Sequence, residues 1–455
     1  MSPAPPAPAA PDPLSVVGIG ADGWDGLPAA SRQALRTAEV LIGGARQLAL
    51  LPEECAGERV PWPSPLRPAV PGLLAAYAGR RVCVLASGDP MFYGIGRTLT
   101  EVLGERAAAG AGEAAGGAGE AAGGSPAPGA GPRLRILPHP SSVSHACARL
   151  GWPLEDTEVV TLVGRPAGNL VRALYDGRRV LVLSAGAGTP AEVAALLRAR
   201  GFGPTRMRVL EQLGGPRERT AEGTADDWDA PPGDPLNVLA LDCRRAPGTP
   251  PLSTVPGLPD AAYEHDGQLT KRHVRAATLA ALAPAPGELL WDIGGGSGSI
   301  AVEWLRAHRS CRAVSVERDP VRAERIGRNA QALGVPGLRV VPGSAPAALD
   351  GLPTPDAVFI GGGLTAPGLL AACWTALPPG GRIVANTVTL ESEALLADWY
   401  RRHGGELVRL AVAHAVPVGG FTGWRQAMPV TQWAAVKPPS ASPSPTALPQ
   451  ETEQS

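Results

Sequence analysis

The chain has 455 residues and a formal net charge of −1. This length exceeds the size at which one hydrophobic core keeps growing, so two or three domains are expected. The chain has two lysines, Lys271 and Lys437, and this scarcity together with the balanced charge excludes a polybasic face for nonspecific binding of nucleic acid.

Six cysteines are scattered along the chain without a C-x-x-C spacing. They predict reduced structural thiols, with neither a zinc site nor a disulfide framework. Residues 1–13 are rich in proline and alanine and lack the basic and apolar segments of a signal peptide. No apolar stretch approaches the length of a membrane span. We therefore expect a cytoplasmic protein with no metal and no membrane partner.

The first predicted strand covers residues 14–20 and ends in a glycine turn. A helix over 29–38, a short strand over 40–44 and a strand over 80–86 follow. The last strand leads into Ser87-Gly88-Asp89-Pro90, a small-residue turn at the carboxyl edge of a predicted parallel sheet, where open α/β folds bind ligands. Taken alone this turn is a weak signal, because turns of this composition are common.

Residues 105–132 contain a near-repeat of Gly-Glu-Ala-Ala-Gly-Gly. Such a composition cannot bury enough apolar surface to offset its ordering entropy, so a disordered insertion is expected there. Beyond it, strands are predicted over 179–183 and 236–241, with a helix over 190–200 between them. The proline-rich residues 246–262 are predicted to be a stiff linker between two domains.

The second half opens with an apolar run that leads into Trp291-Asp292-Ile293-Gly294-Gly295-Gly296-Ser297-Gly298, followed by apolar residues at helical spacing. This pattern predicts a strand, a tight turn and a helix, the first β-α unit of a nucleotide-binding fold. Glycine permits positive φ and lets a ligand lie against the backbone, where free amides at a helix N-terminus point outward.

The register of the glycines indicates which nucleotide binds. The dinucleotide pattern G-x-G-x-x-G, started at Gly294, requires glycine where Ser299 stands. An acid followed by alternating glycines fits instead and resembles the turn of class I methyltransferases that use S-adenosylmethionine. Glu317 ends the next predicted strand, where a carboxylate can accept both ribose hydroxyls. A chance run of glycines in an alanine- and glycine-rich chain is the alternative.

Three motifs of the first half resemble the tetrapyrrole methylase family when taken together: residues 17–20, residues 87–94 and Pro140-Ser141-Ser142-Val143. The resemblance implies two α/β subdomains with S-adenosylmethionine in the cleft between them. It places cofactor contacts on two turns, at Gly88, Asp89, Ser141 and Ser142. The first loop, residues 18–22, departs from the commoner glycine-proline-glycine form of the family.

In the second half, residues 266–275 resemble the opening segment of decarboxylating precorrin methyltransferases. That resemblance implies that Thr270 contacts the cofactor, although a plain helix N-cap is the alternative for this residue. It also implies that Ala345 lies over the adenine. The cofactor-binding residues predicted for this half are Thr270, Gly294, Gly295, Gly296, Ser297, Gly298, Glu317 and Ala345.

Candidates for the chemistry stand near the predicted acceptor side. S-adenosylmethionine is already activated by its sulfonium, so the protein supplies mainly alignment and a dry cavity. These candidates are Gly362, which follows the fourth strand, and Asn386 and Thr387, which end the fifth. His273 is a candidate proton donor. The alternative for these residues is a structural role, notably a tight turn at Gly362. The implied substrate has many carboxylates, which arginines can bind by bidentate pairs, and the candidates, if not ordinary surface residues, are Arg272, Arg275 and Arg425.

The expected architecture is α/β, with a tetrapyrrole methylase fold over residues 14–245, a Rossmann-like class I methyltransferase domain over 263–437 and a disordered tail over 438–455. The resemblance implies methylation of a precorrin-6 type tetrapyrrole at carbons 5 and 15, with decarboxylation of the ring C acetate, giving precorrin-8 in cobalamin biosynthesis. A homo-oligomer is expected. The alternatives are a methyltransferase acting on RNA or protein, a non-catalytic S-adenosylmethionine-binding regulator, and a dinucleotide oxidoreductase.

Overall fold

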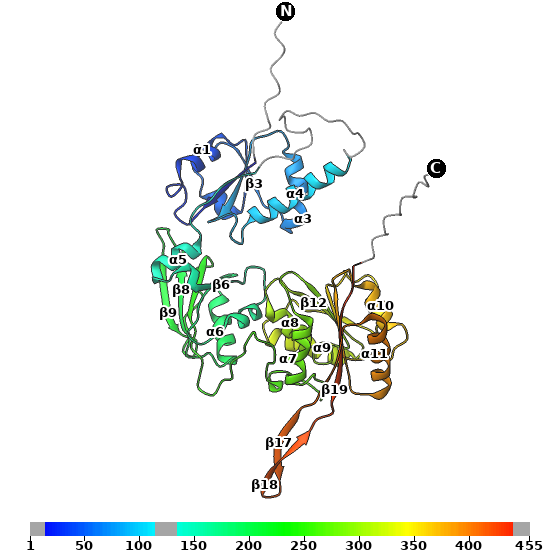
Figure 1. Ribbon diagram of the computed structural model, residues 1–455. Coiled ribbons are helices and arrows are strands. Elements are labelled where there is room, and N and C mark those ends of the chain that lie inside the picture. Colours follow the sequence, from blue (N-terminus) through cyan, green and yellow to red (C-terminus); the bar gives the residue numbers. More distant parts are fainter. Residues whose placement is uncertain (1–13, 114–133, 440–455) are drawn as a thin grey trace, which may run out of the picture. The chain divides into compact units, whose positions relative to one another are not determined.

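The computed structural model describes residues 14–113 and 134–439, and these form an α/β protein (Figure 1). The chain divides into two compact units. The first unit contains the described residues up to Arg165 together with Asp176–Pro247. The second contains Pro166–Tyr175 and the residues from Gly248 onward. The predicted α/β class is confirmed.

The first unit begins with a five-stranded parallel sheet in the order β3-β2-β4-β1-β5. Val17 and Ile19 pack into one apolar cluster and Leu14 and Val16 into another, so both faces of the sheet are covered, as parallel sheets require. Its elements are β1 (Leu14–Ile19), α1 (Ala29–Thr37), β2 (Val40–Gly43), α2 (Ala45–Ala49), β3 (Glu58–Pro61), α3 (Leu66–Ala76), β4 (Val82–Ser87), α4 (Ile95–Glu113) and β5 (Leu134–Leu137).

A second sheet of the first unit has the order β6-β7-β10-β8-β9. It is mixed, because β6 and β7 are parallel whereas the remaining neighbours are antiparallel. Helix α5 packs on this sheet through Val143 and Ala146. Its elements are α5 (Ser142–Leu150), η1 (Leu154–Asp156), β6 (Thr157–Thr161), β7 (Arg179–Leu183), α6 (Thr189–Ala199), β8 (Arg206–Glu211), β9 (Arg219–Thr224) and β10 (Asn237–Asp242).

The second unit is built on a seven-stranded sheet in the order β13-β12-β11-β14-β15-β19-β16. The first five strands are parallel, and β19 runs antiparallel to both of its neighbours. Its elements are η2 (Ala167–Ala173), η3 (Asp260–Ala262), α7 (Arg272–Leu282), β11 (Leu289–Ile293), α8 (Ser299–Ala307), β12 (Arg312–Glu317), α9 (Pro320–Ala332), β13 (Arg339–Pro342), η4 (Ala347–Leu349), β14 (Ala357–Ile360), α10 (Leu369–Ala376), β15 (Arg382–Thr387), α11 (Leu390–His403), β16 (Glu406–Leu410) and β19 (Val430–Val436).

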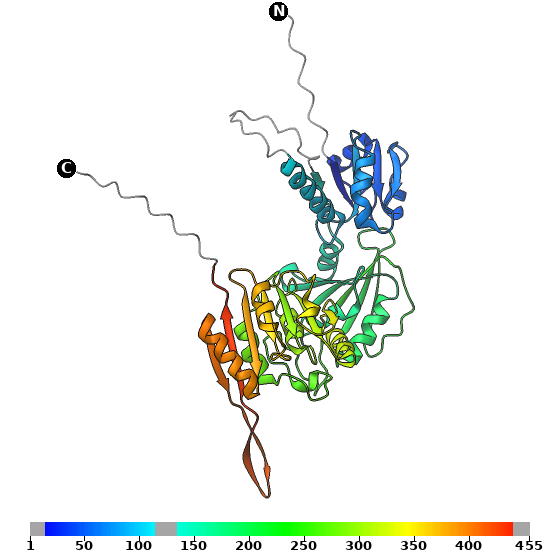
Figure 2. The ribbon, with the colours of Figure 1, turned by 90° about the vertical axis from the view of Figure 1, so that its right-hand side faces the viewer.

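A hairpin between β16 and β19 projects from the body of the second unit (Figures 1 and 2). It consists of β17 (Ala413–Val418) and β18 (Phe421–Gln426), which pair only with each other among the described strands. Phe421 and Trp424 are 85% and 79% exposed on it. The sequence reasoning did not predict this hairpin.

The structure departs from two predicted boundaries. The second part of the predicted linker belongs to the core of the second unit, because Leu258 is only 2% exposed and packs with Tyr263. Helix α4 extends to Glu113, so the first residues of the predicted insertion are helical. Residues 114–132 of that insertion and 440–455 of the predicted tail lie outside the described residues. No described helix is both long and apolar enough to cross a bilayer.

Candidate functional site

Three loops of the first unit meet at the carboxyl edge of its parallel sheet. They follow β1, β4 and β5, which are neighbours in that sheet. A Cβ atom added at Gly18 would clash with the carbonyl of Gly88 and lie 2.8 Å from the backbone nitrogen of His139. A Cβ atom at Gly88 would lie 3.1 Å from Ser141 Cα. Glycine at positions 18 and 88 therefore lets the three backbones approach one another.

The four cofactor residues predicted for the first half lie on two of these loops or at the start of the helix that follows. Gly88 has a φ of +59°, which a residue with a side chain rarely adopts. Asp89 Oδ1 accepts the Met91 N–H at 2.8 Å and so fixes its own turn. Ser141 caps helix α5, with its Oγ accepting the Ser144 N–H at 3.1 Å. Ser142 begins this helix, where backbone N–H groups have no partner within the helix and can meet a ligand.

A histidine–aspartate pair lies at the same carboxyl edge of the sheet. It was not predicted from the sequence. His139 is 5% exposed, and its Nε2 lies 3.1 Å from both carboxylate oxygens of Asp22. His139 Nδ1 is buried without a hydrogen-bond partner in the described part of the chain. The two residues are 117 positions apart, so no local motif announces the pair. His139 does stand beside the Pro140-Ser141-Ser142 motif, which is the one signal that could have found it.

The glycine turn of the second unit has the backbone conformation that its register predicted. Gly294, Gly296 and Gly298 have φ values of +72°, +60° and +75°, and α8 begins directly after them. Gly295 is needed for a different reason: a Cβ atom there would clash with the Ser315 side chain. The alternating glycines are therefore required by the backbone itself and are not an accident of composition.

Glu317 ties this turn to the neighbouring strand. Its Oε2 accepts the Gly296 N–H at 2.8 Å and its Oε1 accepts the Asp319 N–H at 3.0 Å. Because a carboxylate has about four lone-pair positions, two remain for hydroxyl donors. Ser297, at the base of the turn, is 1% exposed, and its hydroxyl has no hydrogen-bond partner in the residues that the structure describes.

Asp292, the acid that precedes the glycines, is fully inside the protein. Its burial raises the pKa of the carboxyl to about 7, and the nearby charge of Glu317 adds to the rise. The Ser315 hydroxyl donates to Asp292 Oδ2 at 3.2 Å and opposes the rise, as does the Ala301 N–H. Asp292 therefore holds the turn as a neutral or partly ionised group near neutral pH.

The Gly361–Gly363 turn lies against the glycine turn. A Cβ atom at Gly362 would lie 3.7 Å from Gly294 Cα, which is ordinary contact distance. A Cβ atom at Gly361 would lie 2.7 Å from the Phe359 ring. Gly362 is thus placed beside the predicted cofactor turn, at the carboxyl end of β14.

Thr270 and Ala345 lie in loops of the second unit. Helix α7 begins at Arg272 and its N-cap is Lys271, so Thr270 is not the helix N-cap and that alternative is wrong. The carbonyl of Gln268, two residues earlier, would lie 3.2 Å from a Cβ atom at Gly296, which puts this segment over the glycine turn. Ala345 is partly buried and follows the turn after β13.

Asn386 is part of a buried polar network that the sequence did not reveal. Its Nδ2 donates to Thr278 Oγ1 at 2.8 Å, and its Oδ1 accepts from Gln432 Nε2 at 2.9 Å. Gln432 Nε2 also lies 3.0 Å from Thr278 Oγ1. Thr387 accepts the Thr389 N–H at 3.2 Å through its hydroxyl. The network fixes the orientation of the Asn386 amide and connects α7, β15 and β19.

Arg275 does not have the accessibility expected of a substrate ligand. It is 0% exposed, and its Nε donates to Glu303 Oε1 at 2.6 Å. Its other nitrogens donate to Asp260 at 3.2 Å and to the carbonyls of Thr270 and Leu258. The expectation that Arg275 binds substrate is therefore corrected: it joins the segment before α7 to the core.

The other predicted ligands of the second unit are exposed. Arg272 and His273 begin α7, and the His273 ring centroid lies 5.9 Å from that of His414 on the hairpin. Arg425 pairs with His414 in the ladder of that hairpin. The structure therefore brings His273 and His414 together and places Arg425 on the strand next to His414, whereas Arg275 lies inside the unit.

All six cysteines are buried and free. Burial raises the pKa of Cys83, Cys243 and Cys373 to about 12, so these thiols stay protonated and are poor nucleophiles. Within the described ranges, no group of three or more His, Cys, Asp or Glu side chains could hold a metal ion.

Comparison with known proteins identifies both halves. Residues 13–117 and 126–229 match the family model described as tetrapyrrole (corrin/porphyrin) methylases, and residues 261–437 match the precorrin methyltransferase domain. The C-terminal domain of precorrin-6Y C5,15-methyltransferase from Rhodobacter capsulatus, a solved structure, is 53% identical over 41% of this chain and 100% of its own, with a TM-score of 0.39.

Two curated relatives extend the similarity over both halves. A protein of Sinorhizobium sp named precorrin-6Y C(5,15)-methyltransferase (decarboxylating) is 46% identical over 93% of this chain and 96% of its own length. A protein of the same name from Mycobacterium tuberculosis (strain CDC 1551 / Oshkosh) is 47% identical over 93% of this chain and 100% of its own length. Because this identity extends across nearly the whole chain, the protein belongs to the precorrin-6Y C(5,15)-methyltransferase (decarboxylating) family of methyltransferases.

Proposed function

We propose that the protein methylates a precorrin-6 type tetrapyrrole at carbons 5 and 15 and removes carbon dioxide from its ring C acetate, giving precorrin-8 in cobalamin biosynthesis. The relatives' names state both carbons and the decarboxylation. We assign carbon 5 to the first unit, and carbon 15 with the decarboxylation to the second. The methyl donor is S-adenosylmethionine, bound once in each unit.

One observation carries this proposal: each unit has its own glycine-lined turn at the carboxyl edge of a parallel sheet. In the first unit the turn is at Gly88, and in the second it comprises Gly294, Gly296 and Gly298. Both lie where open α/β folds bind ligands. Two separate donor sites on one chain suit two methyl transfers to one substrate.

In the second unit, Glu317 accepts the ribose hydroxyls with the lone pairs left by Gly296 and Asp319. Ala345 lies over the adenine, and Thr270 contacts the donor from the segment before α7. Gly88, Asp89, Ser141 and Ser142 bind the donor in the first unit. When bound, S-adenosylmethionine supplies an activated methyl group, and the protein aligns the acceptor carbon and excludes water.

The decarboxylation depends on the surroundings of Gly362. An acetate carboxylate held against a turn without side chains loses its hydration, which favours the departure of neutral carbon dioxide while the macrocycle accepts the electron pair. Asn386, oriented by Thr278 and Gln432, and Thr387 lie at the end of β15 and are the candidate side chains for this chemistry. The exposed Arg272 and Arg425 bind substrate carboxylates, and His273 is the candidate proton donor.

The division of labour is tested with two variants of the full-length protein. Asp89→Ala should impair methylation at carbon 5, because the turn that Asp89 fixes would loosen. Gly296→Val should leave only carbon 5 methylation, since a side chain at a φ of +60° is strained and its Cβ would lie 3.2 Å from the Gln268 carbonyl oxygen. The products are read by mass spectrometry of the tetrapyrrole.

Matched controls distinguish a local from a general effect. Asp25→Ala removes an exposed carboxylate on the loop after β1, and Gly420→Val adds a side chain into open space at the hairpin tip. Both controls should give the wild-type product. Doubly methylated, decarboxylated product from Gly296→Val would refute the assignment of carbon 15 to the second unit, and equal loss at both carbons in Asp89→Ala would mean that the two sites are coupled.

A further inference from the structure

A partly buried arginine at the carboxyl edge of the first unit's parallel sheet forms no ion pair with any carboxylate of the described residues. Strands β2 and β4 are parallel neighbours in register, with Ile42 opposite Val84. The residues that follow β2 therefore lie beside the end of β4. Arg46, in the short helix α2, donates from Nη2 to Ser87 Oγ at 3.1 Å, and Gln47 donates from Nε2 to the same oxygen at 2.6 Å.

These three side chains present more donors than acceptors. The Ser87 oxygen has two lone pairs, and Arg46 and Gln47 use both. The Ser87 hydroxyl hydrogen and the remaining guanidinium hydrogens then have no acceptor among the residues for which the structure gives side chains. Burial lowers the pKa of Arg46, and the charge of Asp234 opposes this shift without forming an ion pair. A partly desolvated cation that forms no ion pair is costly, and a bound anion lowers that cost.

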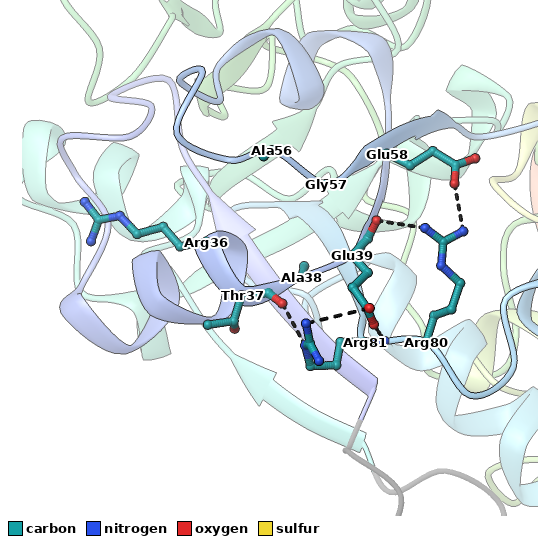
Figure 3. A pocket seen from close by; sticks show the side chains of 9 residues that line it. All are labelled: Arg36, Thr37, Ala38, Glu39, Ala56, Gly57, Glu58, Arg80 and Arg81. Carbon is teal, nitrogen blue, oxygen red and sulfur yellow. Dashed lines mark hydrogen bonds and ion pairs between the residues drawn. The ribbon is translucent and has the colours of Figure 1, made fainter.

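Other arginines of the first unit show the contrast. Arg36, Arg67, Arg80 and Arg81 each have a glutamate oxygen within 3.7 Å. Three of them line the hollow of about 770 Å³ drawn in Figure 3, which lies at the amino ends of the same strands. In that hollow the Arg80–Glu58 and Arg81–Glu39 pairs already balance the charges. Unlike them, Arg46 forms no ion pair with a carboxylate of the described residues.

We propose that Arg46, Gln47 and Ser87 form a carboxylate-binding subsite of the first unit. Ser87 directly precedes Gly88 and Asp89, so the subsite adjoins the turn to which the methyl donor is assigned. This inference rests on the proposed function, under which two ligands carry carboxylates to this edge. One is the tetrapyrrole, through an acetate or propionate side chain, and the other is the methyl donor, through its methionine carboxylate. A guanidinium with adjacent amide and hydroxyl donors matches the planar geometry of a carboxylate.

The test compares Arg46→Gln with the wild type in the full-length protein, with Arg36→Gln as the matched control because Arg36 is an exposed arginine of the same unit. Three quantities are measured: KM and kcat for carbon 5 methylation of the reduced precorrin, and Kd of S-adenosylhomocysteine by calorimetry. Because each unit is proposed to bind the donor once, the binding event of the first unit is identified as the one that Asp89→Ala removes.

The two sources of the carboxylate give different results. If the subsite takes a tetrapyrrole side chain, Arg46→Gln should raise KM by about 10- to 100-fold, the loss expected for a charge-assisted hydrogen bond, with Kd of S-adenosylhomocysteine unchanged. The salt dependence of KM should also become shallower, which a purely structural role of Arg46 would not produce. If the subsite takes the donor's carboxylate, Kd should weaken by a similar factor and KM for the tetrapyrrole should not change.

Arg46→Lys keeps the charge but loses the planar fork, so it should give an intermediate effect, and it carries the test if Arg46→Gln does not fold. Wild-type KM and Kd in the folded Arg46 variants, equal to those of Arg36→Gln, would overturn the subsite while leaving the proposed function intact. If the wild type yields no product methylated at carbon 5, the proposed function fails and the subsite fails with it.

Discussion

The backbones of Gly294 and Gly362 lie in contact at the carboxyl edge of the second unit's sheet, and a Cβ atom added at Gly294 would be 2.8 Å from the nitrogen of Gly362. Gly294 also has a φ of +72°. Gly294→Ala should therefore lower the free energy of unfolding by about 2 kcal/mol or more, from the left-handed backbone and the clash together. Urea unfolding measures this loss. Gly362→Ala is the matched control: its Cβ would be at an ordinary 3.7 Å from Gly294 Cα, so its effect should stay within about 0.5 kcal/mol.

The space beside Gly362 also allows a test of the decarboxylation. Because a Cβ atom fits there, Gly362→Asp places a charge next to the turn without a backbone clash. A charged neighbour keeps water and counter-ions near the substrate acetate and repels its carboxylate, so carbon dioxide release should fall by at least about tenfold, the equivalent of 1.4 kcal/mol. Release is followed with substrate labelled in the ring C acetate. Undiminished release from Gly362→Asp would rule out the apolar-surroundings account. Wild-type release from Gly362→Ala would show that a loss in Gly362→Asp comes from the charge and not from the added side chain.

The features that were predictable from the sequence are those that a short segment determines by itself. The alternation of Gly294, Gly296 and Gly298 follows from a turn whose φ values are positive at those three positions. The strands that lead into such turns were also predictable, because a buried parallel strand is a continuous apolar run. The predicted β7 over residues 179–183 agrees with the structure to the residue.

The features that were missed depend on partners far apart in the sequence. Asn386 was predicted as a site residue, but its orientation depends on Gln432, 46 positions later. The Asp22–His139 pair joins the loops after the neighbouring strands β1 and β5, although the two residues are 117 positions apart in the sequence. The hairpin of β17 and β18 has exposed apolar residues on both strands, so it lacks the alternation that identifies a half-buried strand.

Arg275 was proposed as a substrate ligand on residue type alone, and its burial predicts a different phenotype. Arg275→Met leaves the Glu303 carboxylate, which is 3% exposed, without its cation. The free energy of unfolding should fall by about 3–5 kcal/mol. Urea unfolding measures the loss, and the double variant Arg275→Met/Glu303→Gln should recover part of it, because neither charge then remains buried.

Kinetic measurements distinguish the structural role of Arg275 from a role in substrate binding. If it were a substrate ligand, Arg275→Met would raise KM for the tetrapyrrole with little loss of stability. Arg272→Met is the matched comparison, because Arg272 is exposed at the start of the same helix. We expect Arg272→Met to change KM without lowering the free energy of unfolding by more than about 0.5 kcal/mol.

Asp292 should make the stability of the protein depend on pH in a defined direction. Burial raises the pKa of its carboxyl from 3.8 to about 7 in the folded protein. Below pH 3.8 the Asp292 carboxyl is protonated in both the folded and the unfolded states, so its titration does not lower the free energy of unfolding there. Between about pH 4 and 7 the folded state holds the proton while the unfolded state does not, so stability falls with rising pH, by at most about 1.4 kcal/mol per pH unit.

Asp292→Asn removes this titration and keeps an acceptor for the Ala301 N–H. Relative to the wild type, the variant should therefore gain stability as the pH rises from 5 to 7, and the difference should be constant above about pH 8. Urea unfolding of both proteins at a series of pH values measures the difference, with the exposed Asp350→Asn as the control. If the curves for Asp292→Asn and the wild type run parallel from pH 5 to 8, the carboxyl of Asp292 is already ionised in the folded protein. In that case the Ser315 and Ala301 hydrogen bonds to it, and not its burial, determine its charge.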